Sequence, residues 1–402
     1  MPDFPGPGAT LGYCTNVHPG ATLTQLRASL ERYTLPVKAK VSPRETLAVG
    51  LWLSAATARQ LAEPGQTKEL ADWLAERGLR AFTLNGFPFA DFHQSVVKHA
   101  VYQPDWSDPR RLAYTLDLAR TLAALIPEGA QGSISTLPVG WRADLAQRPG
   151  ALEAAAGHLR DLVHHLARLE LDTGRLIHVD LEPEPGCYLE NSAQVVRFFR
   201  DHLLGTRDDL STRAYLRVCH DVCHAAVMFE PQEQALANYR TAGILVGKVQ
   251  VSSALEAALG EPGSEQRHAV LAQLRPFAEE RYLHQTVLAK SDGSTVFYED
   301  LDAALSAAAM AEAGAHLRTH FHLPIYLDRV GALDTTAAEI GRCLAALRPE
   351  DRVQHFEVET YAWGVLPAEL QTPDLADGIA RELLWLRDRS PRPPGEGKGE
   401  GR

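Results

Sequence analysis

Short apolar runs alternate with Ala- and Leu-rich stretches of helical periodicity along most of this chain of 402 residues. Such alternation is typical of β-α units built around a parallel sheet. The eight apolar runs interpreted as strands lie near residues 10–15, 47–53, 81–84, 132–137, 176–181, 215–219, 247–251 and 353–359. The clearest amphipathic helices span 68–77, 109–124, 149–171, 192–202 and 231–242. We therefore predict an α/β fold, a closed (β/α)8 barrel, with an open parallel sheet of the same strand count as the alternative.

About a hundred residues separate the seventh and eighth apolar runs, far more than one crossover needs. Within them, residues 281–290 and 294–300 flank Ser-Asp-Gly at 291–293, a pattern that predicts a β-hairpin. A helix over 303–313 and an extended segment over 320–326 are expected to follow. We predict one barrel domain over 1–388, with a hairpin and a helix inserted between strands 7 and 8. The Pro/Gly-rich tail at 389–402 is predicted to be disordered.

Composition and charge narrow the classes of function. Hydrophobic residues make up 45% and charged residues 23%, as in ordinary globular proteins. The net charge of −11 argues against a nucleic-acid partner, whose binding surface usually shows as clustered basic residues. We expect neither a secretory signal nor a membrane span, because the required apolar stretches are missing. Five cysteines form no disulfide framework, which favours reduced thiols and a cytoplasmic location.

Acidic and imidazole side chains follow several of the predicted strands. In a parallel barrel the active site lies at the carboxyl ends of the strands. Strand alternation places Asp180 and Glu182 on the same side after the fifth apolar run. Asp221 and His224 lie three positions apart after the sixth. Carboxylate and imidazole side chains at one place are typical of a divalent-metal site.

Further polar residues are expected at the same mouth of the barrel. Gln250 offers a neutral oxygen at the seventh strand, and Glu359 ends the eighth. His320 and His322 share one side of the extended segment. Charged residues in apolar strands are costly unless they are paired or bound to a metal. The predicted metal ligands are Glu182, Asp221, His224, Gln250, His320, His322 and Glu359.

Some nearby residues have simpler explanations. Cys219 and Cys223 are interpreted as small buried residues, because no second cysteine pair completes a zinc set. We expect three other carboxylates to lie at the surface or rim: Glu184, Glu190 and Glu357.

Substrate-binding residues are predicted from the ends of the other strands. Arg142 follows the fourth strand and can pair with an anionic substrate group. The residues assigned to substrate binding are His18, Asn85, His93, Arg142 and His224. The sequence contains no P-loop, no Rossmann glycine motif and no Gly-x-Ser-x-Gly elbow.

These strand-end motifs resemble the xylose-isomerase-like TIM-barrel superfamily, which includes sugar isomerases and epimerases and the endonuclease IV type of phosphodiesterase. Glu182 falls where the superfamily has a fifth-strand ligand, and Asp221-Val-Cys-His224 looks like its Asp-x-x-His motif. Glu359-Thr360 is similar to the Glu-Thr that ends its eighth strand. The resemblance implies a divalent metal bound at these positions.

The chain departs from the superfamily pattern at two positions. His320-Phe-His322 resembles an Asp-x-His pair that supplies ligands in the nuclease branch, but its first residue is histidine. Gln250 stands where the superfamily has a seventh-strand histidine. Both departures argue against a full trinuclear zinc cluster.

Up to about residue 388 the chain looks more specifically like the EboE family, the "metabolite traffic" proteins of the Ebo gene cluster. The matching stretches are YCTNVHPG at 13–20, VYQPDW at 101–106, GSISTLP at 132–138, HVDLEPEPGCYLE at 178–190 and CHDVCHA at 219–225. The resemblance implies a role in the biosynthesis and export of a metabolite. It also implies a functional partner, a prenyltransferase-like membrane protein of the same cluster.

The leading hypothesis is an enzyme that uses a divalent metal to isomerise or epimerise a small polyol- or sugar-like metabolite. Glu182 and Glu359 are the predicted catalytic residues, which shuttle a proton while the metal polarises an oxygen. Mn, Mg, Zn and Fe all fit such a ligand set. Two alternatives stay open: a metal-dependent phosphoesterase of the endonuclease IV type, and a non-catalytic metabolite-binding or traffic protein.

Overall fold

Eight parallel strands form a barrel in the computed structural model, which describes residues 8–204 and 210–389. The strand order is β1-β14-β7-β6-β5-β4-β3-β2, and a parallel bridge between Cys14 and Gly50 joins the two end strands. The predicted (β/α)8 barrel is therefore confirmed. The strands are β1 (Thr10–Tyr13), β2 (Leu47–Trp52), β3 (Leu79–Asn85), β4 (Gln131–Thr136), β5 (Leu176–Leu181), β6 (Leu216–Asp221), β7 (Val246–Val251) and β14 (His355–Val358).

The barrel interior is unusually polar, because the alternation of side chains along each strand directs the polar residues inward. In β5, the buried apolar residues Ile177, Val179 and Leu181 alternate with His178 and Asp180, which contact each other (Nδ1–Oδ1, 2.6 Å). (β/α)8 barrels are usually filled by branched apolar side chains. Here the interior holds paired ionisable groups instead.

A lysine and a glutamate form the central ion pair of this interior. Lys248 in β7 donates to Glu357 in β14 (2.7 Å) and to Ser135 in β4 (3.0 Å). All three side chains are fully buried. Glu357 therefore lies inside the barrel, and the expected surface position is wrong.

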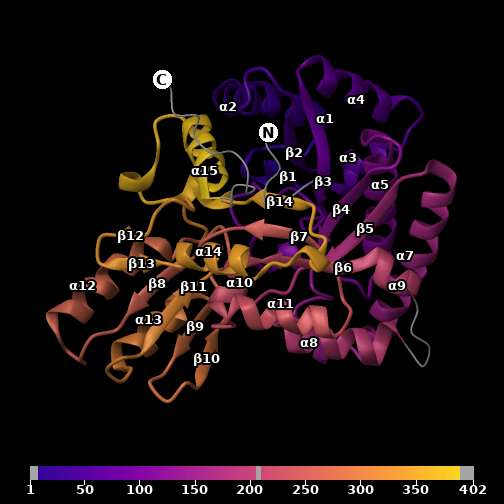
Figure 1. Ribbon diagram of the computed structural model, residues 1–402. Helices are drawn as coiled ribbons and strands as arrows, with labels where there is room; N and C mark the ends of the chain where they lie inside the picture. The colour runs from indigo at the N-terminus through magenta and orange to yellow at the C-terminus, as the bar shows by residue number, and fades with distance from the viewer. Residues whose placement is uncertain (1–7, 205–209, 390–402) are drawn as a thin grey trace, which may run out of the picture.

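Helices cover the outside of the barrel (Figure 1). Gly150 and Gly174, both with positive φ, bound the longest of them, α7. No helix in the described ranges combines the length and apolar character needed to cross a bilayer. These helices are α1 (Leu23–Ser29), α2 (Leu35–Val41), α3 (Ala55–Leu61), α4 (Gln66–Glu76), α5 (Pro109–Leu125), α6 (Arg142–Ala146), α7 (Ala151–Thr173), α8 (Ser192–Phe198), α9 (Leu210–Tyr215), α10 (Val222–Val227), α11 (Gln232–Thr241), α14 (Ala337–Ala346) and α15 (Leu375–Arg389).

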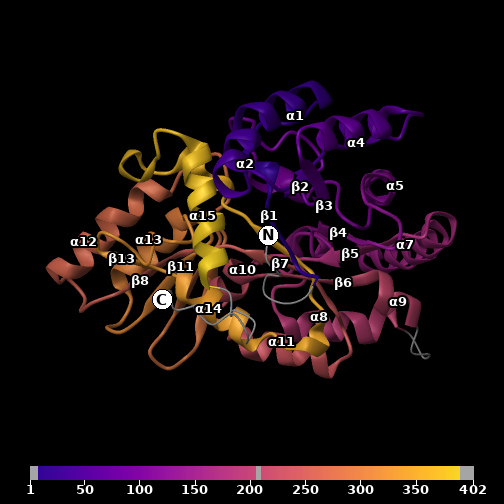
Figure 2. The same ribbon diagram turned by 45° about the horizontal axis from the view of Figure 1, so that its top comes forward.

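A second, antiparallel sheet is inserted between β7 and β14 and lies beside the barrel in both views (Figures 1 and 2). Its six strands have the order β10-β9-β11-β8-β13-β12. We call residues 252–336 the insert. Its elements are β8 (Leu255–Ala258), α12 (Glu265–Leu274), β9 (Thr286–Ala289), β10 (Thr295–Tyr298), α13 (Leu301–Met310), β11 (His316–Thr319), β12 (Arg329–Val330) and β13 (Leu333–Thr335).

The insert is larger than the sequence indicated. The predicted hairpin corresponds to β9 and β10, and the predicted helix corresponds to α13. The segment over 320–326 is not a strand, because β11 ends at Thr319 and Pro324 has no N–H for a ladder. Leu323 instead donates its N–H to the carbonyl of Ser253, directly after β7 (2.9 Å). This contact holds the segment at the carboxyl end of the barrel.

Candidate metal centre

Three buried carboxylates converge at the carboxyl ends of the barrel strands. Glu182 follows β5, Asp221 ends β6 and Glu359 follows β14, and their oxygens lie within 4.8 Å of one another. Among the described residues, Glu182 Oε2 and Asp221 Oδ2 have no hydrogen-bond partner. Buried carboxylate oxygens without a partner are costly, and a cation compensates them directly. These three side chains therefore fit a divalent metal.

The electrostatics of the carboxylates agree with this fit. Burial, and then the charge of Glu359, raise the pKa of Glu182 well above its ordinary value. Burial, and then the charge of Asp221, raise the pKa of Glu359 to about 7. Part of each shift comes from repulsion between the carboxylates, and a bound dication relieves this repulsion. Protons and a metal ion therefore compete for the same oxygens.

Three histidines form a second cluster next to the carboxylates. The Nε2 atoms of His224 and His320 lie 3.2 Å apart, and those of His320 and His322 also lie 3.2 Å apart. Nitrogens that each lie about 2.1 Å from a tetrahedral metal are separated by about 3.4 Å. One oxygen of Asp221 lies within 4.8 Å of ligand atoms of His224 and His322, so Asp221 connects the two clusters.

Neighbouring oxygens determine which nitrogen of each ring carries the hydrogen. Every Nδ1 faces an oxygen that only accepts: Pro183 O for His224 (2.9 Å), Gln285 Oε1 for His320 (2.9 Å) and Glu359 O for His322 (2.8 Å). The hydrogens therefore lie on Nδ1, and the three Nε2 lone pairs are left to bind a metal. Burial lowers the pKa of His322 to about 4, which keeps this ring neutral.

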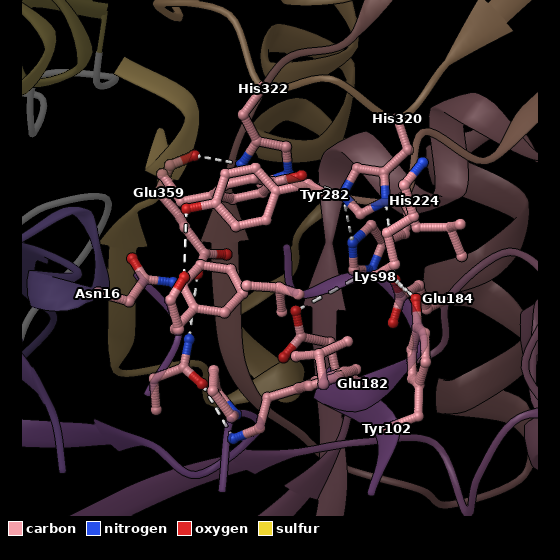
Figure 3. A pocket seen from close by; sticks show the side chains of 18 residues that line it. Asn16, Lys98, Tyr102, Glu182, Glu184, His224, Tyr282, His320, His322 and Glu359 are labelled. Atoms are coloured by element: carbon pink, nitrogen blue, oxygen red, sulfur yellow. Dashed lines mark hydrogen bonds and ion pairs between the residues drawn. The ribbon is translucent and has the colours of Figure 1, made fainter. Parts of the chain in front are cut away.

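A cavity of about 70 Å³ adjoins both clusters. Figure 3 shows His224 and His320 beside each other and Glu359 across the cavity, next to Asn16. Asp221 and Gln250 do not line the cavity; both are buried, and they are paired in register across β6 and β7. The predicted residues that line the cavity are Asn85, Glu182, His224, His320, His322 and Glu359.

Three predicted substrate-binding residues do not line the cavity. His18 is buried, stacks on Tyr33 with 4.5 Å between ring centroids, and hydrogen-bonds to the Tyr13 hydroxyl (3.1 Å). Arg142 pairs with Glu190 (2.6 Å) at the start of α6. His93 contacts the backbone oxygen of Asn16 through Nε2 (2.7 Å). These residues support their neighbours rather than face the cavity.

Glu184 was expected at the surface, but it is buried and lines the cavity. It accepts hydrogen bonds from the Tyr102 hydroxyl and from the Gln285 amide (both 2.7 Å). Gln285 thereby links Glu184 to His320. Its role had no signal in the sequence, because it depends on how the insert folds back onto the barrel. Glu190 is also buried, since it is held by Arg142 and by the N–H of Gly186.

Solved structures share this architecture. A xylose isomerase-like TIM barrel protein from Mycobacterium smegmatis, determined in complex with magnesium, matches with a TM-score of 0.51 and 11% identity, over 97% of this chain and 98% of that chain. This chain has the xylose-isomerase-like TIM-barrel fold. No family model matches the chain. No curated protein matches its sequence.

Two further similar structures have lower scores. The 3-keto-D-glucoside 4-epimerase YcjR from E. coli has a TM-score of 0.43 and 14% identity, over 94% of this chain and 99% of that chain. The IolI protein with a zinc atom has a TM-score of 0.43 and 11% identity, over 95% and 98%. Similarity at this level reports the fold, so the chemistry has to be argued from the site itself.

Proposed function

We propose that this chain is a metal-dependent enzyme that isomerises or epimerises a small metabolite with a hydroxyl group next to a carbonyl group. The convergence of two ligand clusters carries the proposal. Unpaired oxygens of buried carboxylates and the Nε2 atoms of three imidazoles converge at the barrel mouth. The adjoining cavity gives a small molecule access to that place.

The side chains suit proton transfer next to a polarised oxygen. A bound divalent cation supplies the polarisation of a substrate carbonyl or hydroxyl oxygen. Glu182 and Glu359 line the cavity and are the groups that take and return a proton. Asn16 and Asn85 donate to Glu359 Oε1 (2.5 and 3.0 Å) and orient it.

The ligand types restrict the metal. Imidazoles bind Zn and Fe in proteins more readily than Mg. The thiol of Cys223 also lies within 4.8 Å of ligand atoms of His320 and His322. We infer a transition metal at the histidine cluster. The carboxylate cluster alone also accommodates Mg or Mn.

Elemental analysis of the purified protein tests this proposal. We expect stoichiometric metal that is removed by a chelator and is lost in Asp221→Asn and His322→Ala. The matched control is His165→Ala, because His165 is exposed on α7, belongs to neither cluster and does not line the cavity. The proposal is ruled out if the purified protein contains no metal and the two variants have the same metal content as the control.

Solvent exchange tests the reaction class. The metal-loaded protein is incubated in D₂O with short hydroxy-ketones and hydroxy-aldehydes, and deuterium at the carbon beside the carbonyl is measured by mass spectrometry. Enzyme-dependent incorporation that is lost in Glu359→Gln supports proton shuttling. Release of p-nitrophenol from a model phosphodiester supports the phosphoesterase alternative instead. Tight binding of a co-purified metabolite without turnover supports a traffic protein.

The resemblance to the EboE family extends the proposal to a pathway. We infer that the metabolite belongs to an Ebo-type biosynthesis and export pathway, that the protein acts in the cytoplasm, and that the prenyltransferase-like membrane protein is its functional partner. Deletion of either gene is expected to abolish the same exported metabolite. Export that persists in one of the two deletions contradicts the shared pathway.

A further inference from the structure

The cavity has two chemically different walls. One wall carries the metal-binding clusters and the amides of Asn16 and Asn85. The other, which we call the apolar wall, comes from the long loop after β3 and from the insert, and consists of Phe87, Pro88, Phe92, Val97, Val101 and Leu283. A pocket for a fully hydroxylated sugar needs hydrogen-bonding groups on both sides of the ligand, because a buried hydroxyl without a partner is costly.

Three polar residues near the apolar wall already have partners, whereas a fourth, Tyr361, packs against Phe92 (5.6 Å between ring centroids) and its hydroxyl forms no hydrogen bond with the described residues. Lys98 forms an ion pair with Asp300. The Tyr282 hydroxyl donates to the backbone oxygen of Phe92 (3.4 Å). The Tyr102 hydroxyl donates to Glu184 (2.7 Å), on the opposite side of the cavity. Apart from the Tyr361 hydroxyl, a ligand hydroxyl at this wall has to share groups that already have partners, or it stays unpaired.

Contacts between the loop after β3 and the insert hold the apolar wall together. The N–H groups of Val97 and Lys98 both donate to the backbone oxygen of Arg281 in the insert (2.7 and 3.1 Å). The rings of Phe92 and Tyr282 stack with 4.9 Å between centroids. The loop after β3 and the insert are thereby joined over the barrel mouth, and their apolar side chains are held in place.

The small size of the cavity limits the ligand further. A cavity of about 70 Å³ holds roughly five or six water-sized groups, since each needs about 10–15 Å³ in this measure. The enclosed part of the ligand is therefore compact. It has space for a metal-binding pair of oxygens and a short end that contacts the apolar wall.

We propose that the substrate is a compact hydroxy-carbonyl compound with an alkyl end, such as a deoxy or alkyl-substituted derivative, rather than a fully hydroxylated sugar. This inference rests on the proposed function. The oxygens of the substrate face the carboxylates and imidazoles, and its alkyl end contacts the apolar wall. The wall thus determines which hydroxy-carbonyl compounds are accepted.

Two hydroxamates of equal size test the inference on the metal-loaded protein. Propionohydroxamate and glycolohydroxamate share the chelating group and differ only in a terminal methyl or hydroxyl group. Isothermal titration calorimetry should show propionohydroxamate binding about tenfold tighter, because its methyl group contacts the apolar wall, whose aliphatic and phenylalanine side chains offer a hydroxyl no partner. Val97→Thr, which places a hydroxyl in the wall at nearly constant volume, should reduce this preference several-fold.

Val96→Thr is the matched control, since Val96 is 54% exposed and does not line the cavity, and it should keep the preference. If Val97→Thr fails to fold, Val101→Thr replaces it, because Val101 is only partly buried. Equal affinities, or a preference for glycolohydroxamate, overturn the apolar-end inference while the metal-dependent function stands. Protein that holds no metal, or holds metal but binds neither hydroxamate, overturns both.

Discussion

His224 and His320 face each other through their Nε2 atoms at 3.2 Å, although 96 positions separate them in the sequence. His224 lies in α10, directly after β6 of the barrel, whereas His320 follows β11 of the insert. The insert is therefore part of the candidate metal centre and not an appendage on the barrel. It also provides Gln285, whose oxygen orients His320.

Gln285→Leu is predicted to weaken metal binding about 10- to 100-fold, because the Nδ1 hydrogen of His320 loses its acceptor. The measurement is a competitive titration with a chromophoric chelator. Gln266→Leu, on an exposed position of α12, is the control and should bind metal like the unchanged protein. Equal affinity of the two variants contradicts an orienting role for Gln285.

Lys248→Met is predicted to destabilise the fold by about 3–5 kcal/mol, because Glu357 is left charged and unpaired inside the barrel. Combining it with Glu357→Gln should restore much of the loss, as urea denaturation will show. Lys68→Met removes an exposed ion pair with Asp72 and should change the free energy of unfolding little. Additive effects of Lys248→Met and Glu357→Gln argue against coupling between them.

Glu382 is predicted to make stability depend on pH. Burial raises its pKa to about 7, while the oxygen of its side chain accepts from Thr360 Oγ1 (2.6 Å) and Ile325 N (3.1 Å). Because the folded pKa is higher than the unfolded one, the stability from this group is present at low pH and is lost as the pH rises towards 7. Relative to Glu382→Gln, the unchanged protein should lose about 2–3 kcal/mol between pH 5 and pH 8. A pH-independent difference between the two proteins refutes this assignment.

Gly50→Ala is predicted to destabilise the barrel by about 1–3 kcal/mol, because the new Cβ lies 1.4 Å from Glu357 Oε1 and forces that side chain to move. Gly157→Ala in α7 meets no atom within 4 Å and should stabilise the protein by about 0.5–1 kcal/mol. Thermal unfolding of the two variants should therefore shift in opposite directions. A shift in the same direction shows that Glu357 can move without cost.

The barrel could be predicted because each of its strands carries a local signal. Residues 176–181, for example, form an apolar alternation that needs no long-range information, and β5 spans that range. The insert was only partly predictable. The hairpin β9–β10 has a local turn signal, but the two- to four-residue strands β8, β12 and β13 are too short for a periodic pattern.

The candidate site shows the same division. Glu182, Asp221 and Glu359 follow predicted strands, so their convergence follows from the barrel topology. The position of Glu184 depends on contacts with Tyr102 and Gln285, which lie 82 and 101 positions away in the sequence. Contacts between residues so far apart in the sequence cannot be predicted from a local sequence pattern. The same applies to the stacking of His18 on Tyr33, which holds its ring outside the cavity lining.

The polar barrel interior also constrains how this protein can change over evolutionary time. Lys248 pairs with Glu357, and His178 shares a hydrogen bond with Asp180. All four side chains are fully buried. A substitution of one partner leaves the other buried without a partner, which destabilises the fold. Substitutions at these positions are therefore expected to occur together in pairs. The apolar wall has no such coupling, because exchanging one apolar side chain for another leaves no charge behind. Substitutions in the loop after β3 and in the insert can therefore change the ligand preference, while the paired residues inside the barrel stay the same.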